Sequence, residues 1–206
     1  YYGADVLHPK TIRPLFERDI PLRILNSFNP DHPGTLIVKS PHSGRVVKPA
    51  IISTTGLSLV AIGSRDDSWA PQHAAAALQA LGDSGVEAPL FSQSLADHSL
   101  KLVVREQDQA HCLALLKKKF PNGTYTLGVK EKVAIVSVVG FPGADSDGQV
   151  VSQAFLALGR LGTRIIAVAQ AGSGMGNGIS FCIPQDQLAG AVRFLHRDLG
   201  LEGELS

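Results

Sequence analysis

The sequence of 206 residues has few cysteines, few aromatic residues and no excess of either charge. Its two cysteines, Cys112 and Cys182, lie far apart in apolar stretches, so they predict neither a disulfide framework nor a CxxC metal site. The 19 Lys and Arg nearly balance the 18 Asp and Glu, which leaves no basic surface for a nucleic-acid backbone. The longest apolar stretch, 133–141, is much shorter than the roughly 20 residues that span a bilayer. We therefore expect no nucleic-acid partner, no membrane span and a reducing, cytoplasmic location.

What the sequence does contain is 44% apolar residues and an internal repeat. The hexapeptide ALGDSG at 80–85 recurs as ALGRLG at 157–162, which is an offset of 77 residues. The same offset relates Gln93 to Gln170, and it aligns the apolar runs LSLVAIG and VAIVSVVG. The chain therefore carries two copies of one structural unit.

The order of patterns within each copy predicts the fold class. Each copy starts with an apolar strand pattern and a polar loop, and apolar residues then recur at helical spacing, most clearly over 151–161 with Gly162 at the C-cap position. A second strand (86–91 and 164–169), a third strand and a closing helix follow. We predict an α+β protein made of two ferredoxin-like βαββαβ units, whose antiparallel sheets carry helices on one face.

A glycine-rich run at 172–178 raises the alternative of a nucleotide-binding α/β enzyme. A phosphate-binding loop of that kind is followed by a helix, whereas this run is followed by the strand pattern 179–183. We therefore interpret the run as a hairpin connection. The alternative would require a parallel sheet, and it leaves the repeat unexplained.

Two N-terminal motifs, together with the repeat, resemble the aspartokinase family over essentially the whole chain. The segment GADVLHPKTIRPL at 3–15 resembles the end of the family's kinase domain. Its motif residues are Gly3, Ala4, His8 and Pro9. The segment 20–37 resembles the connector with its NPxxPGT turn, and the repeat resembles the tandem ACT regulatory domains.

The resemblance implies a domain division and a role. Residues 1–45 would be the end of the kinase domain and the connector, 54–130 the first ACT domain, and 46–53 with 131–206 the second, since the family inserts one unit into the other. In the family, the kinase domain uses ATP and Mg²⁺ to phosphorylate the side-chain carboxylate of L-aspartate, and the ACT pair senses an end-product amino acid. The Lys-Phe-Gly-Gly segment that begins the catalytic domain is absent here, so we expect no catalytic residue, cofactor or metal in this chain alone.

The loop after each first strand is one candidate for the effector site. A loop that enters a helix N-terminus offers backbone N–H groups to the carboxylate of an amino acid, and side-chain oxygens can accept from its ammonium group. The candidate residues are Asp66, Asp67 and Ser68 in the first copy and Asp145, Ser146 and Asp147 in the second. Each of them could instead only cap its helix.

A glutamine at the end of each second strand is the other candidate. Gln93 and Gln170 resemble the glutamines at this place in threonine-sensing aspartokinases fused to homoserine dehydrogenase, where they contact the effector. Ser94 and Asp97 follow in a stretch that resembles that subgroup's QSSSEYSI. Pro89 stands where lysine-sensing members more often carry an acidic residue, so threonine is favoured over lysine. The alternative is that both glutamines only satisfy backbone groups at the strand ends.

By the same resemblance, a homodimer would join the ACT sheets side by side, bind the effector between facing units and act on its own kinase domain. The rival is a structural module that holds subunits together and binds no effector. The glycine-rich connection of the second copy is two residues longer than its counterpart and departs from the family's pattern, which leaves effector binding by the second unit open.

Overall fold

The computed structural model has two compact units, with the boundary between Val47 and Lys48. It describes residues 9–38, 48–65, 68–94, 96–121, 123–140, 143–171 and 178–201. Of the helices in these ranges, none is both long and apolar enough to cross a bilayer.

The first unit contains a helix, α1 (Pro9–Glu17), and an antiparallel hairpin of β1 (Leu22–Ile24) and β2 (Thr35–Ile37). Gly34 in the predicted turn has φ 70°, and a Cβ there would overlap the carbonyl oxygen of Ile24, so this position requires glycine. Several large apolar side chains of this unit are exposed, and Phe28 reaches 97%. The others are Ile20, Leu25 and Leu36.

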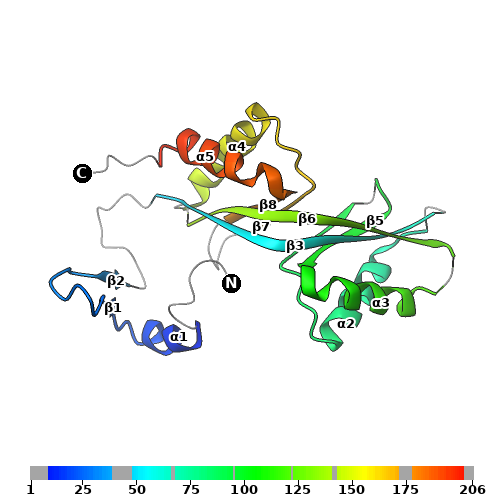
Figure 1. The fold of residues 1–206 in the computed structure, drawn as a ribbon, viewed down its shortest axis with the longest axis horizontal. Helices are drawn as coiled ribbons and strands as arrows, with labels where there is room; N and C mark the ends of the chain where they lie inside the picture. Colours follow the sequence, from blue (N-terminus) through cyan, green and yellow to red (C-terminus); the bar gives the residue numbers. More distant parts are fainter. Residues whose placement is uncertain are drawn as a thin grey trace. The chain divides into compact units, whose positions relative to one another are not determined.

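The second unit is one antiparallel sheet in the order β4-β5-β3-β6-β8-β7, flanked by four α-helices (Figure 1). The strands are β3 (Ala50–Ser64), β4 (Leu90–Ser94), β5 (Ser99–Arg105), β6 (Tyr125–Val139), β7 (Ala167–Ala171) and β8 (Gly178–Pro184). The helices are α2 (Pro71–Asp83), α3 (Gln109–Lys119), α4 (Gly143–Arg160) and α5 (Leu188–Asp198), with short 3-10 turns η1 (Glu106–Asp108) and η2 (Gln185–Gln187). The predicted fold class, two βαββαβ units with antiparallel strands, is confirmed.

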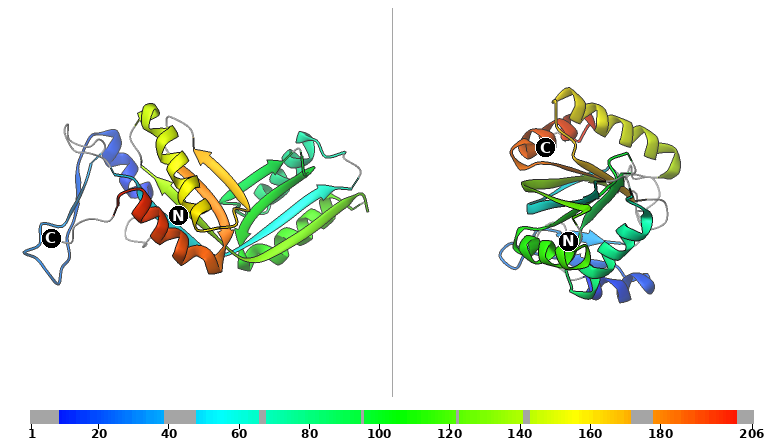
Figure 2. Two further views of the ribbon diagram at one scale, coloured as in Figure 1. Left: turned by 90° about the horizontal axis from the view of Figure 1, so that it is seen from above. Right: turned by 90° about the vertical axis from the view of Figure 1, so that its right-hand side faces the viewer.

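Three apolar clusters hold this unit together. One lies under α2 and α3, and a second lies under α4 and α5, on the opposite outer side of the strands (Figure 1). The third lies between the two halves of the sheet. The end-on view of Figure 2 shows the strands of the sheet between the two helix pairs. We call the third cluster the inner cluster; its buried members are Leu57, Leu59, Leu90, Val103, Val133, Ile135, Ala167 and Cys182.

The two halves of the sheet share β3 and β6, each of which has 15 residues. The domain boundaries predicted from the sequence fall within these two strands, which the structure shows as continuous. Residues 50–54 of β3 pair with 135–139 of β6 in the second half. In the first half, residues 57–63 pair with β5, and residues 57–64 pair with 125–133 of β6. The chain thus enters the second half, crosses to the first and returns. The exact domain boundaries at 53/54 and 130/131 stay a prediction.

The second strand of each copy starts later than predicted, at Leu90 in β4 and at Ala167 in β7. In the first copy Val86, the predicted strand start, instead completes the turn that ends α2, and in the second copy Thr163, just before the predicted start, completes the turn that ends α4. Gly85 and Gly162 both have φ 70° there, and the amide of the next residue donates to a carbonyl five residues back. The predicted C-cap at Gly162 is confirmed, and the same cap explains both shifted strands.

Candidate functional site

Three connections meet at one end of the first ACT unit: the loop after β3, the β4–β5 hairpin and the turn before β6. Ser64 N donates to the His98 carbonyl (3.1 Å), and Arg65 N donates to the Thr124 carbonyl (2.9 Å). A Cβ at Gly63 would lie 2.8 Å from the His98 carbonyl oxygen, so the close approach of the hairpin depends on glycine. The structure therefore brings together the loop and the hairpin that the sequence marks as candidates.

Several backbone N–H groups of this loop already have acceptors within the chain. Trp69 N donates to Ser64 Oγ (3.1 Å), and Ala70 N donates to His73 Nδ1 (3.0 Å). Pro71, the first residue of α2, has no N–H to offer. An effector carboxylate at these amides would have to displace the side chain of Ser64 or His73. These two acceptors are not predicted from the sequence.

Of the loop residues predicted to bind the effector, Ser68 is exposed, while Asp66 and Asp67 lie outside the described residues. Ser94 and Asp97 help to shape the β4–β5 turn, where Ser94 Oγ accepts from Asp97 N (3.2 Å). The Asp97 carboxylate also accepts from Lys101 Nζ (3.0 Å). Asp97 is therefore engaged within its own hairpin, although an exposed ion pair of this kind is weak enough to exchange for a ligand.

The two glutamines occupy equivalent places in the two halves. Gln93 lies opposite Leu100 on β5, and Gln170 lies opposite Ile179 on β8. Directly opposed residues share a face of the sheet, and both of these partners belong to helix-covered clusters. Both glutamine side chains are exposed on that face, each on a strand at the end of the sheet order. Their part in binding stays a prediction.

In the second copy, Asp145, Ser146 and Asp147 fall in the first turns of α4, and their side chains lie outside the described residues. Ala171 pairs with Gly178, so the glycine-rich run joins antiparallel strands and its interpretation as a hairpin is confirmed. Of the kinase-domain motif, Pro9 begins α1, and Gly3, Ala4 and His8 lie outside the described residues.

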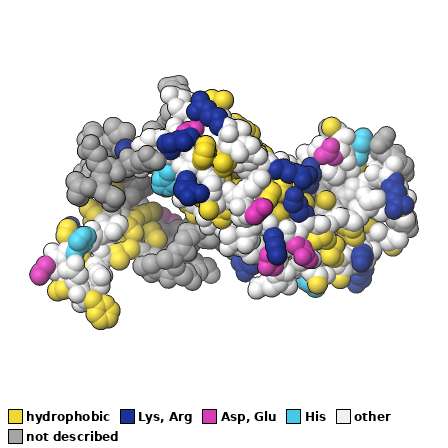
Figure 3. All heavy atoms as spheres, turned by 45° about the horizontal axis from the view of Figure 1, so that its top comes forward, with side chains coloured by type: hydrophobic (Ala, Val, Ile, Leu, Met, Phe, Trp, Pro, Cys, Tyr) yellow, Lys and Arg dark blue, Asp and Glu magenta, His cyan; other side chains and the backbone are white. Residues whose placement is uncertain are grey.

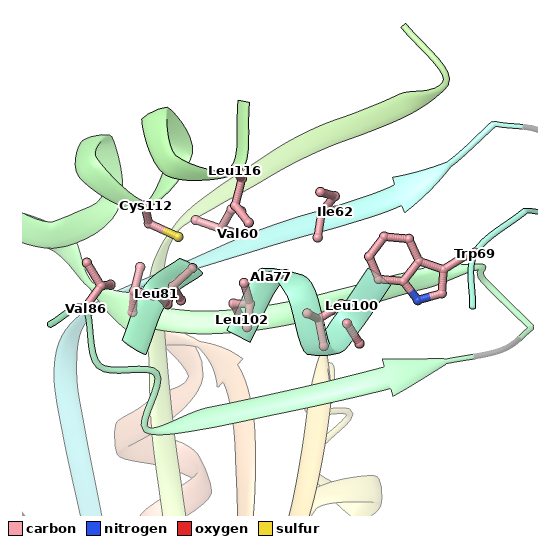
Figure 4. Close-up of a cluster of buried hydrophobic side chains, with 12 residues drawn as sticks. Val60, Ile62, Trp69, Ala77, Leu81, Val86, Leu100, Leu102, Cys112 and Leu116 are labelled. Atoms are coloured by element: carbon pink, nitrogen blue, oxygen red, sulfur yellow. The ribbon is translucent and has the colours of Figure 1, made fainter. Parts of the chain in front are cut away.

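Sequence reasoning missed a group of four rings beneath the first loop, which we call the aromatic cluster: Trp69, His73, Phe120 and Tyr125. Ring centroids are 4.9 Å apart for Phe120 and Tyr125, 5.5 Å for Trp69 and His73, and 5.7 Å for His73 and Tyr125. Trp69 is 4% exposed and closes the end of the core beside Ile62 (Figure 4). Its Nε1 has no hydrogen-bond partner among the described residues.

Charge is mixed over this unit. On the face drawn in Figure 3, described basic and acidic side chains are interspersed. Within the described ranges, no three His, Cys, Asp or Glu side chains are grouped so that they could hold a metal ion. Burial raises the pKa of both Cys112 and Cys182 to about 11, so both remain neutral thiols near neutral pH.

Comparison with known proteins identifies relatives along nearly the whole chain. A bifunctional aspartokinase/homoserine dehydrogenase of Haemophilus influenzae is 28% identical over 204 residues, which is 97% of this chain and 25% of that protein. Bifunctional aspartokinase/homoserine dehydrogenase 2 of Zea mays is 31% identical over 206 residues, 95% of this chain and 22% of that protein. The chain belongs to the aspartokinase family. It spans about a quarter of the length of these relatives, and no family profile matches it.

Solved structures of aspartokinases show the same fold. Clostridium acetobutylicum aspartate kinase superposes with a TM-score of 0.81 at 22% identity, over 97% of this chain and 46% of that one. The regulatory subunit of aspartate kinase from Thermus flavus gives 0.62 at 21% identity, over 75% and 99%. Escherichia coli aspartokinase III in complex with lysine and aspartate, described as the T-state, gives 0.69 at 20% identity, over 94% and 42%.

Proposed function

We propose that this chain is the amino-acid-sensing region of an aspartate kinase. The observation that carries the proposal is the duplicated ACT architecture, in which equivalent exposed glutamines, Gln93 and Gln170, lie at the edges of both halves. An exposed amide next to a strand edge can donate to a carboxylate and accept from an ammonium group, as a free amino acid requires. The E. coli neighbour described with bound lysine supports an amino-acid ligand.

L-Threonine is the effector that we favour, with L-lysine next. The sequence around Gln93 resembles that of threonine-sensing aspartokinases fused to homoserine dehydrogenase, and relatives of this chain are named as fusions of that kind. Pro89 precedes β4 and offers no carboxylate for the side-chain ammonium of a lysine. At the loop end of the first ACT unit, the ligand would compete with Ser64 and His73 for the amides of Trp69 and Ala70.

The whole protein would phosphorylate L-aspartate with ATP and Mg²⁺, through a kinase domain to which residues 1–45 belong. The exposed apolar side chains of the first unit, Phe28 above all, support its packing against further protein. A homodimer would form at the sheet edges, where β4 and β7 have unpaired backbone groups and Phe91 is 51% exposed. Two buried free thiols fit a reducing, cytoplasmic location.

A second candidate function is a structural dimerisation module that binds no effector. The amides engaged by Ser64 and His73 favour it, because the first loop already satisfies these donors by itself. The two candidates differ in one measurable property, which is the response of the folded chain to a free amino acid.

Thermal unfolding with and without threonine, lysine or methionine separates these functions. A ligand selective for the folded state, at about a hundredfold excess over its Kd, should raise Tm by about 5–10 °C. Trp69 is the one tryptophan in the chain, so its fluorescence reports directly on the first loop.

Gln93→Ala should abolish most of the shift while leaving the dimer intact. Gln79→Ala, an exposed glutamine on α2, is the matched control and should keep the full shift. If the unaltered chain responds to none of the three amino acids, the sensing function is wrong. If Gln93→Ala and Gln79→Ala respond alike, the assignment of the site is wrong.

A further inference from the structure

The two ACT units are joined by a crossing at which their outer strands stop. β5 ends at Arg105, opposite Leu57, and β8 ends at Pro184, opposite Val133. Among the described residues of this unit, β3 and β6 are the strands that continue through this point. Any change in the relative twist of the two halves must therefore pass through the backbone of these two strands.

Both long strands are irregular at the crossing. The pairs around it are Thr54 with Ile135, Leu57 with Val133, and Leu59 with Lys130. Between the first two pairs β3 has one residue more than β6, and between the second two β6 has one residue more than β3. The two bulges cancel, so the pairing resumes beyond them in the register that it had before.

Each bulge contains one residue with a left-handed backbone. Gly56 has φ 71°, and Lys132 has φ 54°. They lie 76 residues apart, one less than the offset of the sequence repeat, as do Val60 and Val136, which face the helices in their respective halves. Gly56 and Lys132 therefore occupy structurally equivalent positions of β3 and β6. Glycine adopts this conformation freely, whereas a lysine holds it at a cost, so one side of the crossing is relaxed and the other is strained.

The bulges also determine which side chains face inward. Leu57 and Leu59 of β3 join Val133 and Ile135 of β6 in the inner cluster. Regular alternation from Thr54 would instead turn Ser58 and Val60 inward and move α2 and α3 to the wrong side of the strands. The irregularity is thus part of the fold, and it persists because the inner cluster holds it in place.

We propose that the crossing at Gly56 and Lys132 is a joint about which the two ACT units change their relative twist, and that the strain at Lys132 sets its resting angle. β3 runs from this joint to Ser64 at the first loop, and β6 runs from it to Val139 before the second loop. A ligand that changes the end of either strand therefore acts on the joint directly. This coupling of ligand sites rests on the proposed sensing function; the strained joint itself does not.

Three substitutions test the strain. Lys132→Gly should raise Tm by about 2–6 °C, because glycine removes the cost of the left-handed backbone. Lys132→Ala, the matched control, keeps the β-carbon and should leave Tm within about 1 °C of the unaltered chain. Gly56→Ala should lower Tm by a few degrees, since the new β-carbon is strained at φ 71°.

Spin labels at Gln79→Cys on α2 and Arg193→Cys on α5 test the twist. Both positions are exposed, whereas the native thiols are buried and neutral, which favours selective labelling. In the absence of ligand, Lys132→Gly should shift or broaden the distance distribution, and Lys132→Ala should not. If Lys132→Gly and Lys132→Ala give the same Tm and the same label distances, the proposal of a strained joint at Lys132 is wrong.

Threonine is then added to the labelled chain. It should change the label distance in the unaltered chain, and Lys132→Gly should reduce that change while the Trp69 fluorescence response remains. If the unaltered chain shows no response to amino acids, the sensing function fails, and the ligand-free distances still decide the joint. If binding persists and the distance change is equal in both chains, the coupling role is wrong.

Discussion

The two ACT units have the same interior and different ends. Ala77 and Ala154 are both fully buried at equivalent positions of α2 and α4, and Leu116 and Leu195 are both fully buried at equivalent positions of α3 and α5. At the loop end the first ACT unit has the aromatic cluster, whereas in the second Val150 and Leu199 stand at the counterparts of His73 and Phe120. Packing therefore constrains the interior of both copies, while the ends, where a ligand would bind, have diverged.

This divergence predicts unequal roles for two equal folds. The first loop is closed from beneath by Trp69, and its amides are held by Ser64 and His73. In the second ACT unit, α4 has 18 residues, whereas α2 in the first has 13, so the loop before α4 is shorter than the loop before α2. A ligand that binds well at the loop end of one ACT unit is therefore not expected to bind equally well at the loop end of the other.

The largest expected effect comes from the shared interior. Phe181→Ala in the second half and Leu102→Ala in the first should each destabilise the protein by about 3–5 kcal/mol. Both side chains are fully buried, Phe181 opposite Val136 on β6 and Leu102 opposite Val60 on β3. Because β3 and β6 belong to both halves, urea unfolding should stay a single transition. Trp69 fluorescence and far-UV circular dichroism should therefore coincide for Phe181→Ala. Separate midpoints would show that the halves unfold independently.

A smaller effect should distinguish the two ends. Phe120→Ala removes a ring from the aromatic cluster, and its counterpart Leu199→Ala removes an aliphatic contact under α4 and α5. Both side chains are half-buried, so we expect a loss of about 2 kcal/mol for Phe120→Ala and about 1 kcal/mol for Leu199→Ala. Fluorescence of Trp69 in the folded state should change for Phe120→Ala alone. An equal change in Leu199→Ala would contradict a local role of the cluster.

The smallest effect is a dependence of stability on alkaline pH. Burial raises the pKa of Cys112 and Cys182 in the folded chain from 9.0 to about 11. The folded state then holds these protons more tightly than the unfolded state, so stability present below pH 9 is lost as the pH rises towards 11. At pH 10 the loss should be about 1 kcal/mol for each thiol.

Cys112→Ala and Cys182→Ala each remove one of these thiols. Cys112 lies in the cluster under α2 and α3, and Cys182 lies in the inner cluster. Urea midpoints measured at pH 8 and pH 10 should fall less for either variant than for the unaltered chain. If all three chains lose the same stability, other titrating groups account for the alkaline effect.

The sequence was sufficient to predict the fold because the repeat shows directly that one unit occurs twice, and because the helical spacing within each unit is a local signal. Gly162 marks a helix end by its position alone, and Gln93 and Gln170 are visible as a polar identity kept by the repeat. The joined strands were not predicted, since Thr54 to Gly56 is a polar, glycine-containing interruption that also fits a domain boundary. In the structure it is a bulge, and a bulge depends on the partner strand.

The candidate site was predictable only in part, for a similar reason. Trp69 is about 50 residues from Phe120 and Tyr125 in sequence, and each of the three lies just outside or at the edge of a regular element, so no period relates them. The acceptors of the loop amides are equally hidden, because Ser64 and His73 resemble ordinary residues of a strand end and a first helical turn. Geometry at a loop end depends on several connections together, and a single-sequence pattern reports on one at a time.

The two shared strands limit how this regulatory region can be re-engineered. A chain that starts at residue 54 would leave residues 136–139 of β6 without their partners on β3. Exchanging one ACT unit for that of another aspartokinase would break two continuous strands and the inner cluster at once. A transplant of effector specificity should therefore move residues 50–201 as one block, or change only the loop ends and leave the strands untouched.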